Sequence, residues 1–294
     1  MESDALVVSE HAYGPLAAHR LDLHMPDACS DVGPDGGPDG GPETPRPVVV
    51  YVHGGGWMTG DKSWLGEQPG LRRLADLLLG RGWAIAAINY RLSGEAPFPA
   101  GADDVAAAIA WLSEAAPGLG LDPARIVLLG DSAGAHLSLL TAMRDPHARA
   151  NVRGVVSYYG VPDLAVAVRE RKRRVAEGSE IRGFYLEHMA HPPTPEGRFL
   201  GVEPDAPEAA EVAEAASAVA AAGEGAPPVL LLAGRYDAVA GTEGAEQLAA
   251  RLRAAGVDGR CVLVEAGHGD DLYFTDPALT RELLDFLAAH APSA

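Results

Sequence analysis

The sequence has few of the features that mark nucleic-acid-binding, membrane or secreted proteins. Only 23 of its 294 residues are Lys or Arg, against 41 Asp or Glu, and the formal net charge is −18. A surface this acidic repels phosphate backbones and anionic lipid headgroups. No apolar run reaches the roughly 18 residues of a membrane-spanning helix, and the N-terminus lacks the basic and apolar regions of a secretory signal. We therefore expect no nucleic-acid partner, no membrane association and a cytoplasmic location.

Cysteine is equally scarce. Cys29 falls in a polar segment and Cys261 in an expected strand, and their spacing fits neither a metal site nor a framework of several disulfides. Disulfides are rare in cytosolic proteins, so we expect two free thiols and no bound metal.

The sequence does contain a large apolar fraction, arranged as alternating strands and helices. Hydrophobic residues make up 47% of the chain and charged residues 22%, enough for a large core. The expected strands are 6–8, 21–23, 48–52, 84–89, 126–129, 155–159, 229–233 and 260–265. The expected helices are 71–79, 103–114, 133–143, 244–254 and 277–289. Alternation of helices with near-continuous apolar strands predicts an α/β fold with a mostly parallel sheet covered on both faces.

Two segments interrupt this alternation in what we expect to be a single domain over residues 1–294. Residues 27–47 are dominated by Gly, Pro and Asp, and we expect a flexible surface loop. Residues 162–225 form an insertion before the next core strand, and we expect a lid or cap with a helix near 207–222. The basic cluster Arg169–Arg174 in this insertion has two interpretations, a solvated helix face or a patch that attracts an anionic substrate or carrier.

A serine between two glycines is the first sign of an active site. Ser132, in Gly130-Asp131-Ser132-Ala133-Gly134, follows an apolar strand and precedes an expected helix. A nucleophile elbow has this strand, sharp turn and helix, and its glycines are needed because a Cβ would collide with neighbouring backbone. Ser132 is therefore a candidate nucleophile.

A second glycine run lies upstream. His53-Gly54-Gly55-Gly56-Trp57 also follows an apolar strand, and glycines in such a position can direct backbone N–H groups at a developing oxyanion. This run is therefore a candidate oxyanion loop, in which we expect His53 to order the loop by hydrogen bonds rather than to act as a base.

Two further residues supply the partners that a serine nucleophile needs. A serine hydroxyl requires a base to take its proton, and the base requires a carboxylate to orient it. Asp237 comes just after the strand 229–233 and His268 follows the last strand, in the order Ser, Asp, His that this architecture uses. We treat His136 and Asp104 as structural residues, because the first lies on the helix beneath the serine and the second has no role in such a triad.

These motifs together resemble a known family. The pattern of Leu21–Pro26, His53–Trp57 and Gly130–Gly134, with Asp237 and His268, is similar to α/β-hydrolases of the carboxylesterase, hormone-sensitive-lipase-like and feruloyl-esterase-like group. The resemblance implies an eight-stranded, mostly parallel sheet flanked by helices. It covers the chain except for 27–47 and much of the insertion.

The resemblance also implies roles for individual residues. Ser132 would attack the acyl carbon, His268 would carry the proton, and Asp237 would orient His268. The N–H groups of Gly54, Gly55 and Ala133 would form the oxyanion hole, and Trp57 and Tyr185 are candidate substrate-binding residues. These roles require no metal and no organic cofactor.

The expected activity is hydrolysis of a small to medium carboxylic ester through an acyl-enzyme, with a small molecule as the partner. Several alternatives share the same fold and triad, and these do not choose among them. They are a kynurenine-formamidase-like amide hydrolase, a thioesterase, a lyase or cyclase of specialised metabolism, and a ligand-binding protein without catalysis. The acyl group, the leaving group and the oligomeric state stay open.

Overall fold

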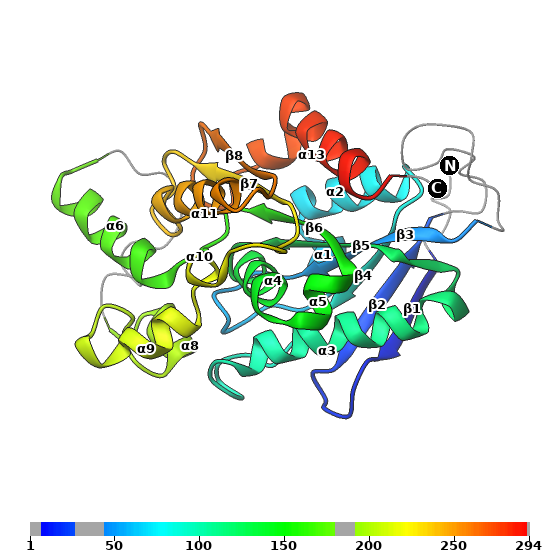
Figure 1. Ribbon diagram of the computed structural model, residues 1–294, viewed down its shortest axis with the longest axis horizontal. Helices are drawn as coiled ribbons and strands as arrows, with labels where there is room; N and C mark the ends of the chain where they lie inside the picture. Colours follow the sequence, from blue (N-terminus) through cyan, green and yellow to red (C-terminus); the bar gives the residue numbers. More distant parts are fainter. Residues whose placement is uncertain (1–6, 27–43, 180–191, 293–294) are drawn as a thin grey trace.

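The computed structural model describes residues 7–26, 44–179 and 192–292. Its centre is an eight-stranded sheet in the order β1-β2-β4-β3-β5-β6-β7-β8 (Figure 1). The strands are β1 (Val7–Ala12), β2 (Arg20–Met25), β3 (Arg46–Val52), β4 (Ala84–Ile88), β5 (Leu121–Asp131), β6 (Val152–Tyr158), β7 (Val229–Gly234) and β8 (Gly259–Val264). Strands β1, β2 and β4 pair antiparallel, and all pairs from β4 to β8 are parallel. The expected mostly parallel sheet is confirmed.

Helices cover both faces of this sheet. The main ones are α2 (Pro69–Leu79), α3 (Ala100–Ala115), α4 (Ser132–Arg144), α11 (Glu243–Ala254) and α13 (Pro277–His290). Shorter helices are α1 (Trp64–Glu67), η1 (Ala116–Leu119), α5 (Pro146–Asn151) and α12 (Leu272–Thr275). The five expected helices therefore lie within or largely overlap the observed ones. No helix in the described ranges has the length and apolar character needed to cross a bilayer.

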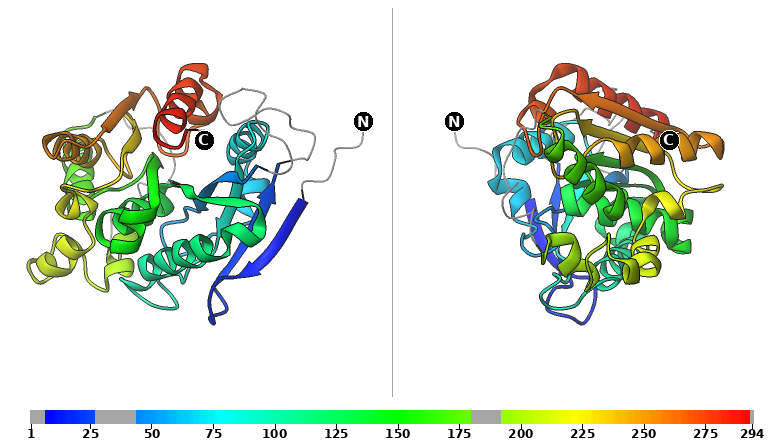
Figure 2. Two further views of the ribbon diagram at one scale, coloured as in Figure 1. Left: turned by 45° about the vertical axis from the view of Figure 1, so that its right-hand side comes forward. Right: turned by 90° about the vertical axis from the view of Figure 1, so that its left-hand side faces the viewer.

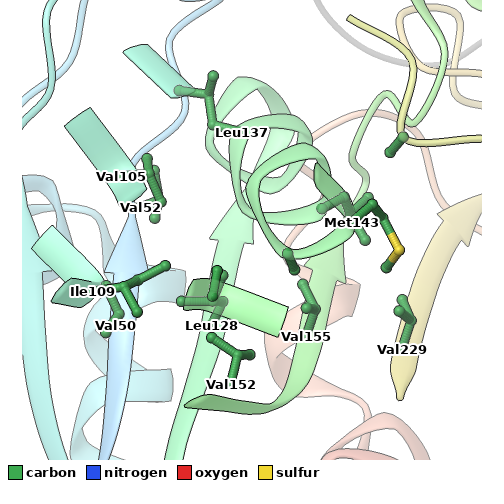
Figure 3. Close-up of a cluster of buried hydrophobic side chains, with 14 of the residues drawn as sticks. Val50, Val52, Val105, Ile109, Leu128, Leu137, Met143, Val152, Val155 and Val229 are labelled. Atoms are coloured by element: carbon green, nitrogen blue, oxygen red, sulfur yellow. The ribbon is translucent and has the colours of Figure 1, made fainter. Parts of the chain in front are cut away.

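The core divides into two layers because successive strand residues face opposite sides. Val48, Val50 and Val52 of β3 pack in the layer beneath α3 and α4, and Val49 and Tyr51 pack in the layer beneath α2 and α13. Figure 3 shows the first layer, where valines of the parallel strands meet side chains of α3 and α4. A sheet buried on both faces explains why its strands are apolar at every position rather than at alternate ones.

The insertion between β6 and β7 lies at the opposite end of the molecule from β1 and β2 (Figures 1 and 2). Its described elements are α6 (Leu164–Ala176), α8 (Pro195–Leu200), η2 (Pro207–Ala209), α9 (Ala210–Ala215) and α10 (Ala218–Ala221). The single helix expected near 207–222 is wrong. The helix breaks at Ser217, whose hydroxyl accepts from Ala220 N–H to cap α10 and donates to Asp163, while the N–H of Ala218 donates to the Pro162 carbonyl.

The structure describes only some of the residues on which two other expectations depend, the flexible loop and the free thiols. The flexible loop 27–47 falls mostly outside them, but Arg46 and Pro47 already belong to β3, so its expected end is two residues too late. Cys261 is a free thiol on β8, and burial raises its pKa to about 11; Cys29 lies outside the described residues.

Candidate active site

Ser132 stands at a strained turn between β5 and α4. Its φ is +50°, a left-handed backbone conformation that is costly for a residue with a Cβ. The flanking glycines are required by close contact: a Cβ on Gly130 would lie 2.5 Å from the carbonyl carbon of Gly134, and a Cβ on Gly134 would collide with the carbonyls of Val52 and His53. The turn presents the serine hydroxyl at the carboxyl end of the sheet.

The structure brings Ser132, His268 and Asp237 together. Ser132 Oγ lies 2.8 Å from His268 Nε2, and His268 Nδ1 lies 2.8 Å from Asp237 Oδ2. A carboxylate only accepts, so Nδ1 carries the ring proton and Nε2 presents its lone pair to the serine hydroxyl. The three residues follow β5, β7 and β8, whose carboxyl ends lie along one edge of the sheet.

The Asp237 carboxylate is fully buried and held by backbone donors. Its Oδ1 accepts from the N–H groups of Val239, at 2.7 Å, and Ala240, at 3.0 Å, which leaves Oδ2 for His268. Asp237 thus caps its own turn and orients the imidazole at the same time.

Tyr159 is a neighbour of the histidine that the sequence reasoning missed. It follows β6, has a φ of +40°, and sets its ring edge-to-face against His268 with the centroids 5.0 Å apart. The adjacent Gly160 packs so closely on α4 that a Cβ there would lie 2.7 Å from the Cβ of Ala135. The sequence feature that could have pointed to Tyr159 is Tyr158-Tyr159-Gly160, at the end of the expected strand 155–159.

The glycine run after β3 forms a tight turn beside Ser132. Gly55 and Gly56 have φ values of +106° and +61°, and the N–H groups of Met58 and Thr59 both donate to the Gly55 carbonyl. Within the described ranges, no hydrogen bond is formed by the N–H groups of Gly55 and Gly56. The N–H of Ala133 lies in the first turn of α4, where helix N–H groups have no partner within the helix.

Gly54 does not fit the predicted oxyanion hole. Its N–H donates to Asp131 Oδ1 at 3.1 Å, and a single hydrogen committed to a buried carboxylate is not available to a substrate. Gly56, the last glycine of the same run, was missed, although the run itself contained the signal. Among the described residues, nothing accepts from the N–H groups of Gly55, Gly56 and Ala133.

His53 orders the oxyanion loop. Its Nδ1 donates to the Gly54 carbonyl at 2.8 Å, and its ring stacks on Tyr90, whose hydroxyl donates to the His53 carbonyl. Burial lowers the pKa of His53 to about 4, so the ring is neutral at pH 7. This agrees with the expectation of a structural histidine. Asp104 is structural too: its buried carboxylate pairs with Arg91 and His19.

Asp131 links the oxyanion loop to the strand that carries Ser132. Besides Gly54 N–H, its Oδ1 accepts from the Tyr51 hydroxyl at 2.8 Å, and all three groups are buried. We expect Asp131→Ala to lower the free energy of unfolding by about 2–5 kcal/mol, because it leaves two buried donors unpaired. Asp131→Asn keeps an acceptor oxygen and should stay near wild-type stability. Denaturant unfolding of both variants measures the difference, and equal losses would contradict it.

The stability difference between Asp131→Asn and the wild type should also depend on pH. Burial raises the pKa of the Asp131 carboxyl, so its contribution to stability is greatest at low pH and declines as the pH rises through the folded-state pKa. Asparagine does not ionise. The stability of Asp131→Asn relative to wild type should therefore increase as the pH rises from about 4 towards neutrality.

The insertion contacts the loop that carries Asp237. Glu170 of α6 accepts from the N–H groups of Thr242 and Glu243 at the start of α11, and Arg174 donates to the carbonyls of Asp237 and Arg235. A carboxylate at a helix N-terminus is favoured by the helix dipole. Helix α6 thus contacts both ends of the segment between β7 and α11 that carries Asp237, which we call the acid loop.

These contacts also bear on the two interpretations of the basic cluster. Arg171 pairs with Glu196 of α8 at 3.0 Å, Lys172 pairs with Asp205, and Arg173 pairs with Glu243. Several of its cations therefore bind carboxylates of the same chain.

Of the two candidate substrate-binding residues, Trp57 and Tyr185, the structure describes only Trp57. Trp57 is 3% exposed and stacks on Phe199 of the insertion, with the ring centroids 4.9 Å apart. Tyr185 lies outside the described residues. Within the described ranges, no group of three or more His, Cys, Asp or Glu side chains is arranged to hold a metal ion.

Comparison with known proteins shows the family. A family model described as BD-FAE matches residues 39–252. The chain belongs to the BD-FAE family. This match covers the oxyanion loop, the serine turn, the insertion and Asp237, and it confirms the resemblance to α/β-hydrolases of the carboxylesterase group.

Relatives of this BD-FAE chain include two mycobacterial proteins. Esterase LipC of Mycobacterium tuberculosis (strain ATCC 25618 / H37Rv) is 31% identical over 78% of this chain and 54% of its own length. Carboxylesterase NlhH of Mycobacterium tuberculosis (strain CDC 1551 / Oshkosh) is 45% identical over 33% of this chain and 28% of its own length. The chain thus spans less than two thirds of either relative.

Solved structures show the same fold. A carbohydrate esterase from gut microbiota, in truncated form, has a TM-score of 0.71 and 20% identity, with 97% of each chain covered. The esterase Est2 of Thermogutta terrifontis has a TM-score of 0.68 and 23% identity, covering 98% of this chain and 94% of that one. At these identities the likeness establishes the α/β-hydrolase fold.

Proposed function

We propose that this protein is a serine hydrolase that cleaves carboxylic esters of small to medium size through an acyl-enzyme intermediate. The observation that carries the proposal is the continuous chain of contacts from Ser132 Oγ through His268 to Asp237, beside unpaired N–H groups. Membership of the BD-FAE family and the esterase names of its relatives support the same chemistry.

The first half of the reaction makes the acyl-enzyme. Ser132 Oγ attacks the ester carbonyl carbon while His268 Nε2 takes the hydroxyl proton. The carbonyl oxygen becomes an oxyanion, which accepts hydrogen bonds from the N–H groups of Gly55, Gly56 and Ala133. Donors of this kind contribute roughly 3–4 kcal/mol each to the transition state. The intermediate then collapses, and the imidazolium gives its proton to the departing alkoxide.

The second half regenerates the enzyme. A water gives a proton to His268 Nε2 and attacks the acyl carbon, the same N–H groups hold the second oxyanion, and the proton returns to Ser132 Oγ as the acid leaves. The Asp237 carboxylate accepts from His268 Nδ1 throughout and stabilises the imidazolium that forms twice. Buried Oδ2 suits this role because water does not compete for the Nδ1 proton.

Active-site labelling tests the proposal. A fluorophosphonate probe should label the folded protein once per chain, with Ser132 as the modified residue, and p-nitrophenyl acetate and butyrate should be hydrolysed. Peptide mass spectrometry locates the label, and the His268→Ala variant should label far more slowly because the serine loses its base. A folded protein that is neither labelled nor active on these esters would overturn the proposal.

A further inference from the structure

A buried hydrogen-bond relay connects the oxyanion loop to the insertion. The indole Nε1–H of Trp57 donates to His136 Nδ1 at 3.2 Å, and His136 Nε2 donates to the carbonyl of Ala216 at 2.9 Å. His136 is fully buried and Trp57 nearly so. The chemistry of the partners fixes the histidine tautomer, because an indole N–H only donates and a carbonyl only accepts.

The relay admits only a neutral imidazole. A protonated ring would turn a second N–H towards the indole N–H and lose that bond. Burial lowers the pKa of His136 to about 4, and no acidic side chain in the described part of the chain hydrogen-bonds the ring, so the neutral form is favoured across the working pH range of most enzymes.

Each member of the relay comes from a different part of the site. Trp57 is the first residue with a side chain after the three glycines, and its own φ is +59°. His136 lies one helical turn after Ser132 on α4. Ala216 lies at the break between α9 and α10, where the last carbonyls of a helix have no partner within it.

Aromatic contacts enclose the relay. Phe199 of α8 stacks on Trp57 and presents its edge to His136, with centroids 4.9 Å and 5.4 Å away. The ring of Trp57 is itself edge-on to His136 at 5.3 Å. Phe199 of the insertion therefore packs directly on Trp57, and the Ala216 carbonyl reaches Trp57 through His136.

From these contacts we infer that His136 is a positioning residue for the oxyanion hole. His136 holds Trp57, and Trp57 in turn keeps the N–H groups of Gly55 and Gly56 in register with Ser132. Glycines have no side chains to hold a loop, so its geometry depends on the residues at its ends. On one side His53 and Asp131 hold Gly54; on the other, Trp57 is held by His136. The inference rests on the proposed hydrolase function.

Four variants separate this role from simple core packing. In His136→Asn the amide oxygen takes the place of Nδ1 and can still accept from Trp57. In His136→Gln the amide nitrogen takes the place of Nε2, so the Ala216 bond survives and Trp57 loses its acceptor. Trp57→Phe removes the donor and retains an aromatic ring against Phe199. Thr141→Val is the matched control, since it removes another side-chain hydrogen bond of α4, the partly buried one from Thr141 Oγ1 to the Ala102 carbonyl at 3.2 Å.

We expect His136→Gln and Trp57→Phe to lower kcat for p-nitrophenyl butyrate by about 10- to 100-fold, with KM changed by less than about threefold, because a small displacement of the donors weakens the transition state more than the ground state. His136→Asn should recover kcat to within about threefold of wild type. The double variant Trp57→Phe/His136→Gln should be no worse than the poorer single variant, because both remove one shared bond.

A second measurement does not depend on activity. The Trp57 indole N–H resonance, assigned by its loss in Trp57→Phe, should shift in His136→Gln and much less in His136→Asn. If kcat of His136→Gln and Trp57→Phe stays within twofold of wild type, or Thr141→Val loses as much kcat, the inference is overturned. A wild-type protein that is neither labelled by the fluorophosphonate nor active would instead overturn the proposed function, which the resonance shift does not test.

Discussion

Replacing Ser132 by alanine should lower kcat/KM for p-nitrophenyl acetate by a factor on the order of 10⁵, because no other group takes over the covalent step. The fold should survive. The serine hydroxyl bonds only His268 Nε2 among the described residues, and the His268 side chain is 15% exposed, so water can replace the lost partner. Stopped assays and fluorophosphonate labelling of the purified variant measure the loss.

The matched variant Ser132→Gly separates chemistry from backbone strain. It should be as inactive as the alanine variant but more stable by about 1 kcal/mol, because glycine adopts a φ of +50° without the penalty that a Cβ brings. Denaturant unfolding compares the two. An alanine variant that keeps full activity on any substrate of the wild type would contradict a covalent mechanism and favour a lyase that uses His268 as its base.

The sequence was sufficient to predict the sheet, and to select three residues that the structure brings together, because both depend on local patterns. Apolar runs of four or five residues mark strands buried on both faces, and the observed β3 and β7 contain the predicted segments. The serine turn is equally local, since its glycines are required within five residues. Asp237 and His268 could be selected because each follows a core strand, in an order that the fold imposes.

What could not be predicted depends on contacts between distant segments. The Gly54 N–H is unavailable because Asp131, 77 residues later, accepts from it, and nothing in the glycine run distinguishes Gly54 from Gly56. The helix break at Ser217 likewise depends on Asp163 and Pro162, which pair with it across 54 residues or more. Local propensity alone favours a continuous helix through these alanines.

The described part of the insertion contacts several segments of the candidate site. Glu170 and Arg174 of α6 bind the acid loop, Phe199 of α8 packs on the oxyanion loop, and the Ala216 carbonyl accepts from His136 of α4. Charged residues of the insertion that look like a solvated surface in the sequence thus bind backbone groups of neighbouring segments.

Replacing Asp237 by asparagine should lower kcat/KM on the order of 10⁴-fold while leaving the structure almost unchanged, and the reason lies in the backbone donors. Val239 and Ala240 N–H groups require an acceptor at Oδ1, so the asparagine oxygen should occupy that position and its NH₂ group should face His268. His268 Nδ1 must then accept, which moves the ring proton to Nε2, where it blocks transfer from Ser132.

The matched control is Asp145→Asn, which changes another capping aspartate, one that accepts from Ala148 N–H at the start of α5 and takes no part in the triad. Its kcat/KM should stay within about twofold of wild type. Steady-state assays near pH 7.5, together with the rate of fluorophosphonate labelling, should show both rates falling in Asp237→Asn and neither in Asp145→Asn. Activity of Asp237→Asn within tenfold of wild type would mean that the imidazole keeps its tautomer without the carboxylate, and another group would then have to orient His268.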